Sequence, residues 1–478
     1  MANFYERLIE RWDLNRAFLR LPSGAVLTYG EVAARTDRLA TGLAIQGVEP
    51  GDRVLSLLSK RPSAVGLYLA CLKVGAAFVP VNPAYTAAEL GYLVDDADPA
   101  LVVTDNSPAT SSGRSEISVD SLAKKRGGPV PRVFDAGGGE LASLIYTSGT
   151  TGRPKGSMLT HDNLAVNALD LVDLWHYGRA DVLVHALPIF HVHGLFVALH
   201  CAMLTGSEVI FLPGFDQKMV SNALSSATVM MGVPTFYHRL LQERSFGPEA
   251  GGMRLFVSGS APLPAGTHRE FEARTGHQIL ERYGMSEAGM ICSNPYEGER
   301  VPGTVGYPLP NVEVRLAAGP NTDESDSAGV LEIRGPNVCT GYWRRPKTEG
   351  FTSGGFFSTG DIARIAADGR VTLEGRATDL IITGGMNVYP MEVESVLTQV
   401  AGAGEVAVIG LPHPDFGEAV VAFHTGSARH DSLAAAAATS LAPYKRPKRF
   451  VLVEELPRNA MGKIQKSVLR SEHASLLR

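Results

Sequence analysis

The run from Tyr146 to Gly156 constrains this chain more than any other stretch of its sequence. It reads Tyr-Thr-Ser-Gly-Thr-Thr-Gly-Arg-Pro-Lys-Gly and overlaps the end of the apolar run that begins at Leu141. This pattern predicts a strand that ends in a flexible loop. Glycines let backbone N–H groups approach an anion, hydroxyls add donors and a lysine adds charge, so the loop suits a polyphosphate. Composition alone would favour a polar hairpin turn, because Gly/Ser/Thr clusters usually form turns.

The spacing of this loop disfavours a kinase or a P-loop ATPase. In the Walker loop a lysine directly follows the second glycine and precedes Ser or Thr. Here Pro154 precedes Lys155, and Gly156 follows it. Another kind of nucleotide site is therefore indicated.

Four further segments resemble parts of the adenylate-forming superfamily, which contains acyl-CoA synthetases, the adenylation domains of peptide synthetases and firefly luciferase. They are residues 257–263 (Val-Ser-Gly-Ser-Ala-Pro-Leu), 281–287 (Glu-Arg-Tyr-Gly-Met-Ser-Glu), 357–361 (Phe-Ser-Thr-Gly-Asp) and 457–463 (Pro-Arg-Asn-Ala-Met-Gly-Lys). Each segment alone is weak, but all of them occur in the family's order. Together with the phosphate loop, the resemblance spans about Leu27 to Lys466.

The resemblance implies binding of ATP, Mg²⁺ and coenzyme A, and it assigns residues to each. For ATP it implies Thr147, Ser148, Gly149, Thr150, Thr151, Gly152, Lys155, Ser260, Ala261, Pro262, Tyr283, Gly284, Met285, Ser286, Asp361 and Arg376. Within this set Tyr283 would stack on adenine, and Asp361 would grip the ribose hydroxyls. Glu287 would hold Mg²⁺, because that ion prefers hard carboxylate oxygens. Gly384 and Gly385 would line the tunnel of the CoA thiol.

The implied reaction proceeds in two steps through an acyl-adenylate. A carboxylate attacks the α-phosphate of ATP, pyrophosphate leaves, and a thiol then takes the acyl group. The catalytic residues would be Lys463, Lys155 and Glu287, which neutralise charge around the in-line displacement. A non-catalytic nucleotide-binding paralogue is the alternative of another class. It is disfavoured because mere binding does not require a lysine that serves only the transition state.

Charged side chains in the expected acyl pocket indicate the acid. Arg282 stands where relatives that use fatty or aromatic acids carry small or aromatic residues, and Arg239, His191 and His193 complete the predicted acyl site. A buried arginine without a partner is costly, so the acid should bring a second anion. Arg239 could instead cap a helix, and one of the histidines is common in the family whatever the acid.

Three segments that contain these residues, and a fourth segment further along the chain, closely resemble malonyl-CoA synthetases. They are residues 190–195, 234–239, 281–287 and 293–298. The resemblance implies ATP-dependent ligation of a short dicarboxylic acid, malonate by preference, to CoA with release of AMP and pyrophosphate. A medium-chain or aromatic acyl-CoA ligase is the alternative. The motifs do not separate malonate from methylmalonate, and they leave the oligomeric state open.

Alternating strand-like and helix-like apolar runs predict an α/β fold with a largely parallel sheet. The resemblance implies a large N-terminal domain of layered sheets and helices, residues 1–375, and a small mobile C-terminal α/β domain, residues 376–478, that carries Lys463. The hinge would fall at Thr378 or Asp379, where the family usually has Asp or Lys. The polar stretch 317–328 is predicted to be a surface loop.

Composition indicates an ordinary globular protein of the cytoplasm. The chain has 478 residues, 45% of them hydrophobic, and a net charge of −5, which gives no reason to expect nucleic acid as a partner. The most apolar stretch, 64–81, is interrupted by Lys73 and Pro80, so it predicts a buried helix entering a strand rather than a membrane span. The N-terminus lacks the apolar core of a signal peptide. Four scattered cysteines predict reduced thiols.

Overall fold

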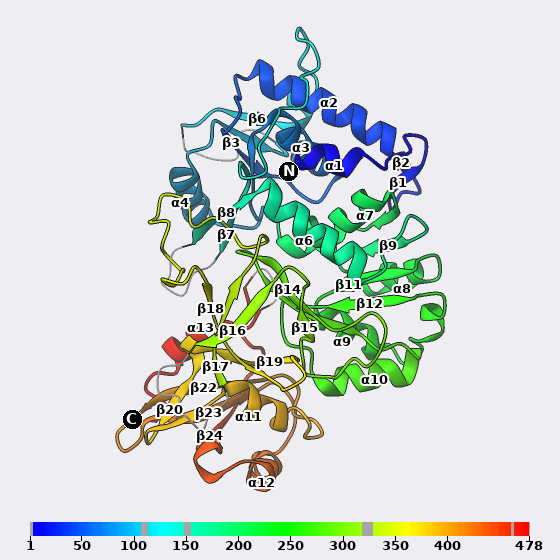
Figure 1. The fold of residues 1–478 in the computed structure, drawn as a ribbon. Helices are drawn as coiled ribbons and strands as arrows, with labels where there is room; N and C mark the ends of the chain where they lie inside the picture. Colours follow the sequence, from blue (N-terminus) through cyan, green and yellow to red (C-terminus); the bar gives the residue numbers. More distant parts are fainter. Residues whose placement is uncertain (1–2, 107–112, 148–153, 318–327, 460–462, 478) are drawn as a thin grey trace.

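The computed structural model describes residues 3–106, 113–147, 154–317, 328–459 and 463–477. It shows a large part that contains three sheets and a smaller part built on a fourth, at the lower end of the molecule in Figure 1. The last strand of the third sheet ends at Arg376, and the first strand of the fourth begins at Ile381. The predicted α/β fold class is confirmed, whereas the domain boundary after residue 375 stays a prediction.

The first sheet has nine strands in the order β15-β14-β13-β12-β11-β9-β10-β1-β2. From β13 to β1 along this order neighbouring strands run parallel, and both edges are antiparallel. Its strands are β1 (Ala17–Arg20), β2 (Val26–Thr28), β9 (Val182–His185), β10 (Glu208–Phe211), β11 (Val229–Gly232), β12 (Leu255–Ser258), β13 (Leu280–Met285), β14 (Gly289–Ser293) and β15 (Tyr307–Pro308). Loops at the carboxyl ends of parallel strands are where α/β sheets bind ligands.

The second sheet has six strands in the order β6-β5-β3-β4-β7-β8 and is parallel except for the β7–β8 hairpin. Its strands are β3 (Arg53–Leu57), β4 (Ala77–Pro80), β5 (Leu101–Thr104), β6 (Glu116–Ser118), β7 (Leu141–Thr147) and β8 (Lys155–Thr160). The predicted phosphate loop therefore joins two antiparallel strands at the edge of this sheet.

The third sheet is antiparallel in the order β16-β17-β18-β19, and the fourth has the order β21-β20-β23-β22 with β24 beside β23. The third contains β16 (Glu313–Ala317), β17 (Ala328–Arg334), β18 (Phe357–Ile365) and β19 (Val371–Arg376). The fourth contains β20 (Ile381–Thr383), β21 (Met386–Val388), β22 (Val406–His413), β23 (Gly417–His424) and β24 (Arg449–Leu452). The loop predicted between residues 317 and 328 lies almost wholly outside the described residues.

Helices cover these sheets (Figure 1). In the larger part they are α1 (Phe4–Ile9), α2 (Tyr29–Ile45), α3 (Pro62–Val74), α4 (Ala87–Ala97), α5 (Val119–Leu122), α6 (His161–Leu174), the π-helix η1 (His193–Leu199), α7 (His200–Thr205), α8 (Gln217–Leu224), α9 (Pro234–Gln242), η2 (Pro248–Ala250) and α10 (Ala265–Thr275). After β19 come η3 (Ala377–Asp379), α11 (Pro390–Leu397), α12 (His430–Ser440), η4 (Pro443–Lys445) and α13 (Lys466–Glu472). The prediction of a buried helix that leads into a strand is confirmed by α3 and β4, which are almost wholly buried.

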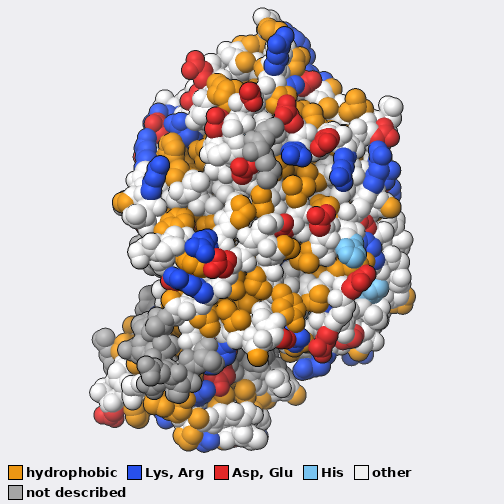
Figure 2. Space-filling view, in the orientation of Figure 1, with side chains coloured by type: hydrophobic (Ala, Val, Ile, Leu, Met, Phe, Trp, Pro, Cys, Tyr) orange, Lys and Arg blue, Asp and Glu red, His pale blue; other side chains and the backbone are white. Residues whose placement is uncertain are grey.

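The surface and the thiols are those of an ordinary globular chain. Lys and Arg side chains are interspersed with Asp and Glu side chains over much of the face in Figure 2. All four cysteines are free and buried. Within the described ranges, no helix is long and apolar enough to cross a membrane.

Candidate active site

The β7–β8 hairpin brings the two ends of the predicted phosphate loop together. Thr147 ends β7 and pairs with Lys155, the first residue of β8. The Lys155 ammonium lies 2.7 Å from Glu349 Oε1 and 5.4 Å from the ring centre of Tyr342. Ser148, Gly149, Thr150, Thr151 and Gly152 lie outside the described residues.

Glu287 lies in the turn between β13 and β14 and is held by two hydroxyls. Thr147 Oγ1 donates to Glu287 Oε1 at 3.2 Å, and the Tyr342 hydroxyl donates to the same oxygen at 3.0 Å. The side chain is buried, with 7% of the residue exposed. Since both bonds go to one oxygen, Oε2 is the carboxylate oxygen that the described hydroxyls leave available. The predicted metal carboxylate therefore lies at the end of the phosphate hairpin.

The residues predicted to bind adenine and ribose form one cluster, in which Tyr283 and Asp361 are buried and Arg376 is half-buried. Asp361 on β18 pairs in register with Arg376 on β19, and Arg376 Nε lies 2.8 Å from Asp361 Oδ1. The Tyr283 hydroxyl of β13 donates to the other oxygen, Oδ2. Burial raises the pKa of Asp361, while Arg376 acts in the opposite direction. Folding thus brings Tyr283 to Asp361, 78 positions further along the chain, and to its strand neighbour Arg376.

Lys463 extends from the smaller part of the molecule toward this cluster. Its ammonium lies within electrostatic range of Arg376, Asp361, Arg282 and Glu287, although the residue remains exposed to solvent. Loss of hydration beside the surrounding protein atoms lowers the pKa of Lys463, and Arg376 lowers it further, against the attraction of the two carboxylates. The Lys463 ammonium thus lies near both the carboxylates and the guanidinium groups of the site.

Ser260 links the loop after β12 to the predicted acyl pocket. It has a backbone φ of +72°, a conformation that non-glycine residues adopt uncommonly. Its hydroxyl lies 3.3 Å from His193 Nδ1. Pro262 is exposed, whereas Ala261 is half-buried, as are Gly284, Met285 and Ser286 after Tyr283. The loop therefore borders both the predicted nucleotide site and the acid site.

Arg282 on β13 is a buried cation without an anionic partner among the described residues. Only 3% of the residue is exposed, and its Nε and Nη2 atoms make no hydrogen bond there. Burial lowers the pKa of Arg282 to about 9, which still leaves it cationic at neutral pH. The adjacent acid, Glu281, accepts a hydrogen bond from the Leu263 backbone instead. Consecutive strand residues point to opposite faces, which explains why Glu281 and Arg282 do not pair.

Two histidines lie beside this guanidinium at the start of η1. The His193 backbone donates to His191 Nδ1 at 3.4 Å, and Arg282 lies within electrostatic range of both rings. Burial, together with Lys463 and Arg282, lowers the pKa of His191 to about 3; burial and Arg282 also lower the pKa of His193. Both imidazoles are therefore neutral at pH 7. They can donate hydrogen bonds without adding charge.

The structure does not bring every predicted residue to this pocket. Arg239 is exposed near the end of α9, with its guanidinium carbon 5.9 Å from the ring centre of Phe215. That position is not a buried one beside Arg282. Nor does it cap a helix end through any contact that the structure records.

Gly384 and Gly385 form the turn between β20 and β21, away from the nucleotide cluster. Their φ angles are +57° and +78°, and two consecutive positive values are typical of a type I′ hairpin. A Cβ at Gly385 would meet nothing within 4 Å. The backbone conformation alone thus explains both glycines. Of the predicted hinge residues, Asp379 pairs with Arg470 at 2.9 Å.

Two residues of the site were not singled out from the sequence. The Arg282 guanidinium packs on Gly259, where an added Cβ would overlap its central carbon. Because Gly259 lies within the predicted 257–263 motif, the sequence contained a signal that could have identified it. Tyr342, which bonds Glu287, lies 55 positions away in a segment without a recognised motif.

Comparison with known proteins identifies the family. A model described as AMP-binding enzyme matches residues 6–343, and one described as AMP-binding enzyme C-terminal domain matches residues 392–463. The chain belongs to the AMP-binding enzyme family. It is 37% identical to the mitochondrial malonate–CoA ligase ACSF3 of Mus musculus, over 92% of this chain and 86% of that one. It is 35% identical to a feruloyl-CoA synthase of Amycolatopsis, over 94% of each chain.

Solved structures of this family include one protein in two states. ATP-bound MatB from Rhodopseudomonas palustris is 43% identical to this family member, covers 100% of both chains and superposes with a TM-score of 0.95. The apo form of MatB, at the same identity and coverage, gives 0.84. The arrangement of the present structure is therefore closer to that of the ATP-bound form.

Proposed function

We propose that this AMP-binding enzyme is a malonate–CoA ligase that forms an acyl-adenylate from malonate and ATP and transfers the malonyl group to CoA. The observation that carries the proposal is the buried Arg282, which has no anionic partner in the part of the chain that the structure describes. The name of the mouse relative, a malonate–CoA ligase, supports the same acid.

The selectivity argument follows from the charge of Arg282. A guanidinium at neutral pH has to be compensated, and the described residues offer it two neutral histidines and no carboxylate. A dicarboxylic acid can react through one carboxylate while the other pairs with Arg282. An acid with a neutral tail would leave the cation unpaired, which costs several kcal/mol. We assign Arg282, His191 and His193 to the acyl site and retain Arg239 as a further proposed contact that its exposed position weakens.

In the first half-reaction the chain would neutralise charge on the reacting phosphate. Lys463 and Lys155 would stabilise the charge that develops as the acid oxygen bonds phosphorus and the bond to pyrophosphate breaks. Asp361 and Arg376 would orient the ribose, and Tyr283 the adenine. The residues of the phosphate loop, 147–152, would bind the phosphates.

Mg²⁺ would be held by Glu287. Within the described ranges no group of three or more His, Cys, Asp or Glu side chains could hold a metal by itself. One carboxylate oxygen, with further ligands from phosphate and water, is the usual protein contribution to Mg²⁺ in nucleotide sites. The ion supplies compensation of phosphate charge when bound.

In the second half-reaction the CoA thiol attacks the acyl-adenylate and AMP leaves. We propose that residues 376–478 move as a domain about a hinge at Thr378 or Asp379, which would take Lys463 out and bring Gly384 and Gly385 toward the thiol path. The different TM-scores against ATP-bound and apo MatB support two arrangements of such a chain. We place the enzyme in the cytoplasm, since four free thiols suit a reducing compartment.

The feruloyl-CoA synthase relative favours an aromatic acid as the second candidate. A panel of malonate, methylmalonate, succinate, acetate, hexanoate and ferulate, scored by pyrophosphate release, separates the two. We expect kcat/KM for malonate to exceed that for acetate, hexanoate and ferulate by at least a hundredfold. Equal values for malonate and hexanoate, or a preference for ferulate, would refute the acid assignment. Failure to release pyrophosphate with any acid would support a non-catalytic nucleotide-binding protein.

A further inference from the structure

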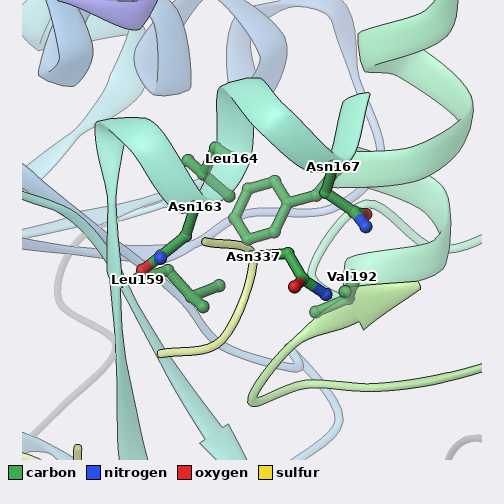
Figure 3. A pocket seen from close by; sticks show the side chains of 8 residues that line it. Leu159, Asn163, Leu164, Asn167, Val192 and Asn337 are labelled. Atoms are coloured by element: carbon green, nitrogen blue, oxygen red, sulfur yellow. The ribbon is translucent and has the colours of Figure 1, made fainter. Parts of the chain in front are cut away.

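Three buried asparagines surround a small cavity behind the turn that carries Glu287 (Figure 3). Asn163 and Asn167 lie one turn apart on α6, and Asn337 lies in the loop after β17. Their exposed fractions are 7%, 5% and 1%. We call these three residues the asparagine clamp, because their side-chain amides link α6, the loop after β17 and the Glu287 turn to one another.

The first member, Asn163, fixes the loop that carries Asn337. Its Nδ2 donates to the carbonyls of Pro336 and Val338, at 2.7 and 2.9 Å. Its Oδ1 accepts the Thr160 backbone N–H at 2.9 Å, as part of the capping box of α6. The Asn337 backbone is thus anchored on both sides to the start of a helix.

The other two members bind the backbone just beyond Glu287. Asn337 Nδ2 donates to the carbonyls of Ala288 and Met290, at 2.8 and 3.1 Å. Asn167 pairs with both backbone groups of Met290: its Oδ1 accepts the N–H at 3.0 Å, and its Nδ2 donates to the carbonyl at 2.8 Å. The same loop also holds Glu287 itself, since the Cys339 N–H donates to the Glu287 carbonyl at 2.7 Å.

The Glu287 turn needs this support because its own pairing is irregular. The β13–β14 register shifts between Tyr283 and Gly284, and Gly289 has a φ of +61°. Buried carbonyls without donors cost free energy, and here side-chain amides supply the donors. Side-chain amides of the clamp therefore take the place of the backbone hydrogen bonds that a regular β13–β14 hairpin would form between its two strands.

We propose that the asparagine clamp consists of positioning residues, which hold the Glu287 carboxylate where it meets the metal–nucleotide complex. This inference rests on the proposed function of Glu287. The clamp acts through the backbone of residues 288–290 and touches no substrate. Its loss should therefore alter the use of Mg²⁺ more than the use of the acid.

The test is Asn337→Asp, which keeps the size of the side chain and removes both donors. It also sets a carboxylate oxygen against the carbonyls of Ala288 and Met290. We expect kcat/KM for pyrophosphate release at saturating malonate to fall on the order of tenfold to a hundredfold. The half-saturating Mg²⁺ concentration should rise severalfold. Asn167→Ser, which keeps an acceptor and loses one donor, is a milder second variant with smaller shifts in the same direction.

The matched control is Asn294→Asp. Asn294 is equally buried, at 2%, and its Nδ2 likewise donates to two carbonyls, those of Glu281 and Thr304, both at 2.9 Å. It should lose thermal stability as Asn337→Asp does, without a change in Mg²⁺ requirement at saturating malonate. Equal Mg²⁺ shifts in both variants, or no shift in the Asn337 and Asn167 variants, would overturn the clamp.

A parallel Glu287→Gln variant separates this inference from the proposed function. It should raise the Mg²⁺ requirement at least as much as Asn337→Asp. If it leaves Mg²⁺ dependence unchanged, the metal role of Glu287 is wrong, and the clamp proposal falls with it. If Glu287→Gln raises the requirement and the asparagine variants do not, only the clamp is refuted.

Discussion

Replacing Arg282 by alanine is the sharpest perturbation that the structure offers. Only 3% of the residue is exposed to solvent, and no carboxylate among the described residues neutralises its charge. A bound dicarboxylate would therefore form a buried ion pair with the guanidinium. Removing one partner of such a pair costs roughly 3–5 kcal/mol. At about 1.4 kcal/mol per factor of ten, kcat/KM for malonate should fall on the order of a hundredfold to a few thousandfold.

The assay compares acids within one variant. Pyrophosphate release is measured with malonate and with acetate, and KM for ATP is measured alongside. We expect kcat/KM for acetate to stay level or rise in Arg282→Ala, because acetate gains nothing from the guanidinium and the unpaired cation is gone. KM for ATP should change less than about threefold, because the substitution leaves the ATP-binding contacts, which serve the reactions of both acids, unchanged.

Arg300→Ala is the matched control for this prediction. Arg300 is partly buried, and its guanidinium donates to the carbonyls of Pro295, Gln278 and Tyr296, so its contacts are structural. This variant should lose stability and keep the malonate-to-acetate ratio. Equal losses for malonate and acetate in Arg282→Ala, or a loss that appears mainly in KM for ATP, would assign Arg282 to structure or to the nucleotide and refute the reasoning.

Four further outcomes are expected from the same geometry. Gly259→Ala should lower kcat/KM for malonate at least tenfold while acetate changes little, because the new Cβ would displace the Arg282 guanidinium; equal losses for both acids would contradict this. The malonate-to-acetate ratio of kcat/KM should fall as pH rises through about 9, because Arg282 is cationic below its lowered pKa and neutral above it. Titration of Lys463 affects the use of both acids, so its effect cancels in the ratio. A ratio that does not change with pH would contradict a charged pocket. Lys463→Ala should abolish most pyrophosphate release but spare thioester formation from supplied malonyl-adenylate, measured in separate half-reactions. Arg239→Ala should cost malonate use less than tenfold, as befits an exposed side chain; a loss as large as that of Arg282→Ala would place it in the pocket.

Local patterns allowed much of the fold to be predicted from the sequence. The apolar runs 53–58, 64–74, 77–81, 87–95 and 101–104 predict alternating strands and helices. They match β3, α3, β4, α4 and β5 to within a few residues, because each element has its own apolar period and terminators. In the C-terminal part the apolar pattern predicts a strand over residues 405–409, and β22 extends four residues beyond the end of that range. That extension depends on antiparallel pairing with β23, which no local pattern encodes.

The site could be predicted only where a motif is continuous in the sequence. Tyr283 and Asp361 belong to separate motifs, and their hydrogen bond appears only after folding. Tyr342 and two members of the asparagine clamp reach the Glu287 turn through contacts between residues 47 to 123 positions apart. The position of Arg239 could not be predicted, because a residue near the end of a helix can face a pocket or solvent without any change in local pattern. The residues 148–152 lie outside the described ranges, so their assigned contacts stay predictions.

In the proposed acid site, selectivity would come from a charge that the described residues leave uncompensated. Glu281 points away on the opposite face of β13, Gly259 lets the Arg282 guanidinium lie against the backbone, and the two histidines remain neutral. If a protein carboxylate lay beside Arg282, the free protein would be more stable, and a dicarboxylic acid would gain little binding free energy from its second carboxylate. With the guanidinium unpaired among the described residues, the substrate itself would supply the missing anion, so discrimination against monocarboxylates would be set by the same desolvation that lowers the pKa of Arg282.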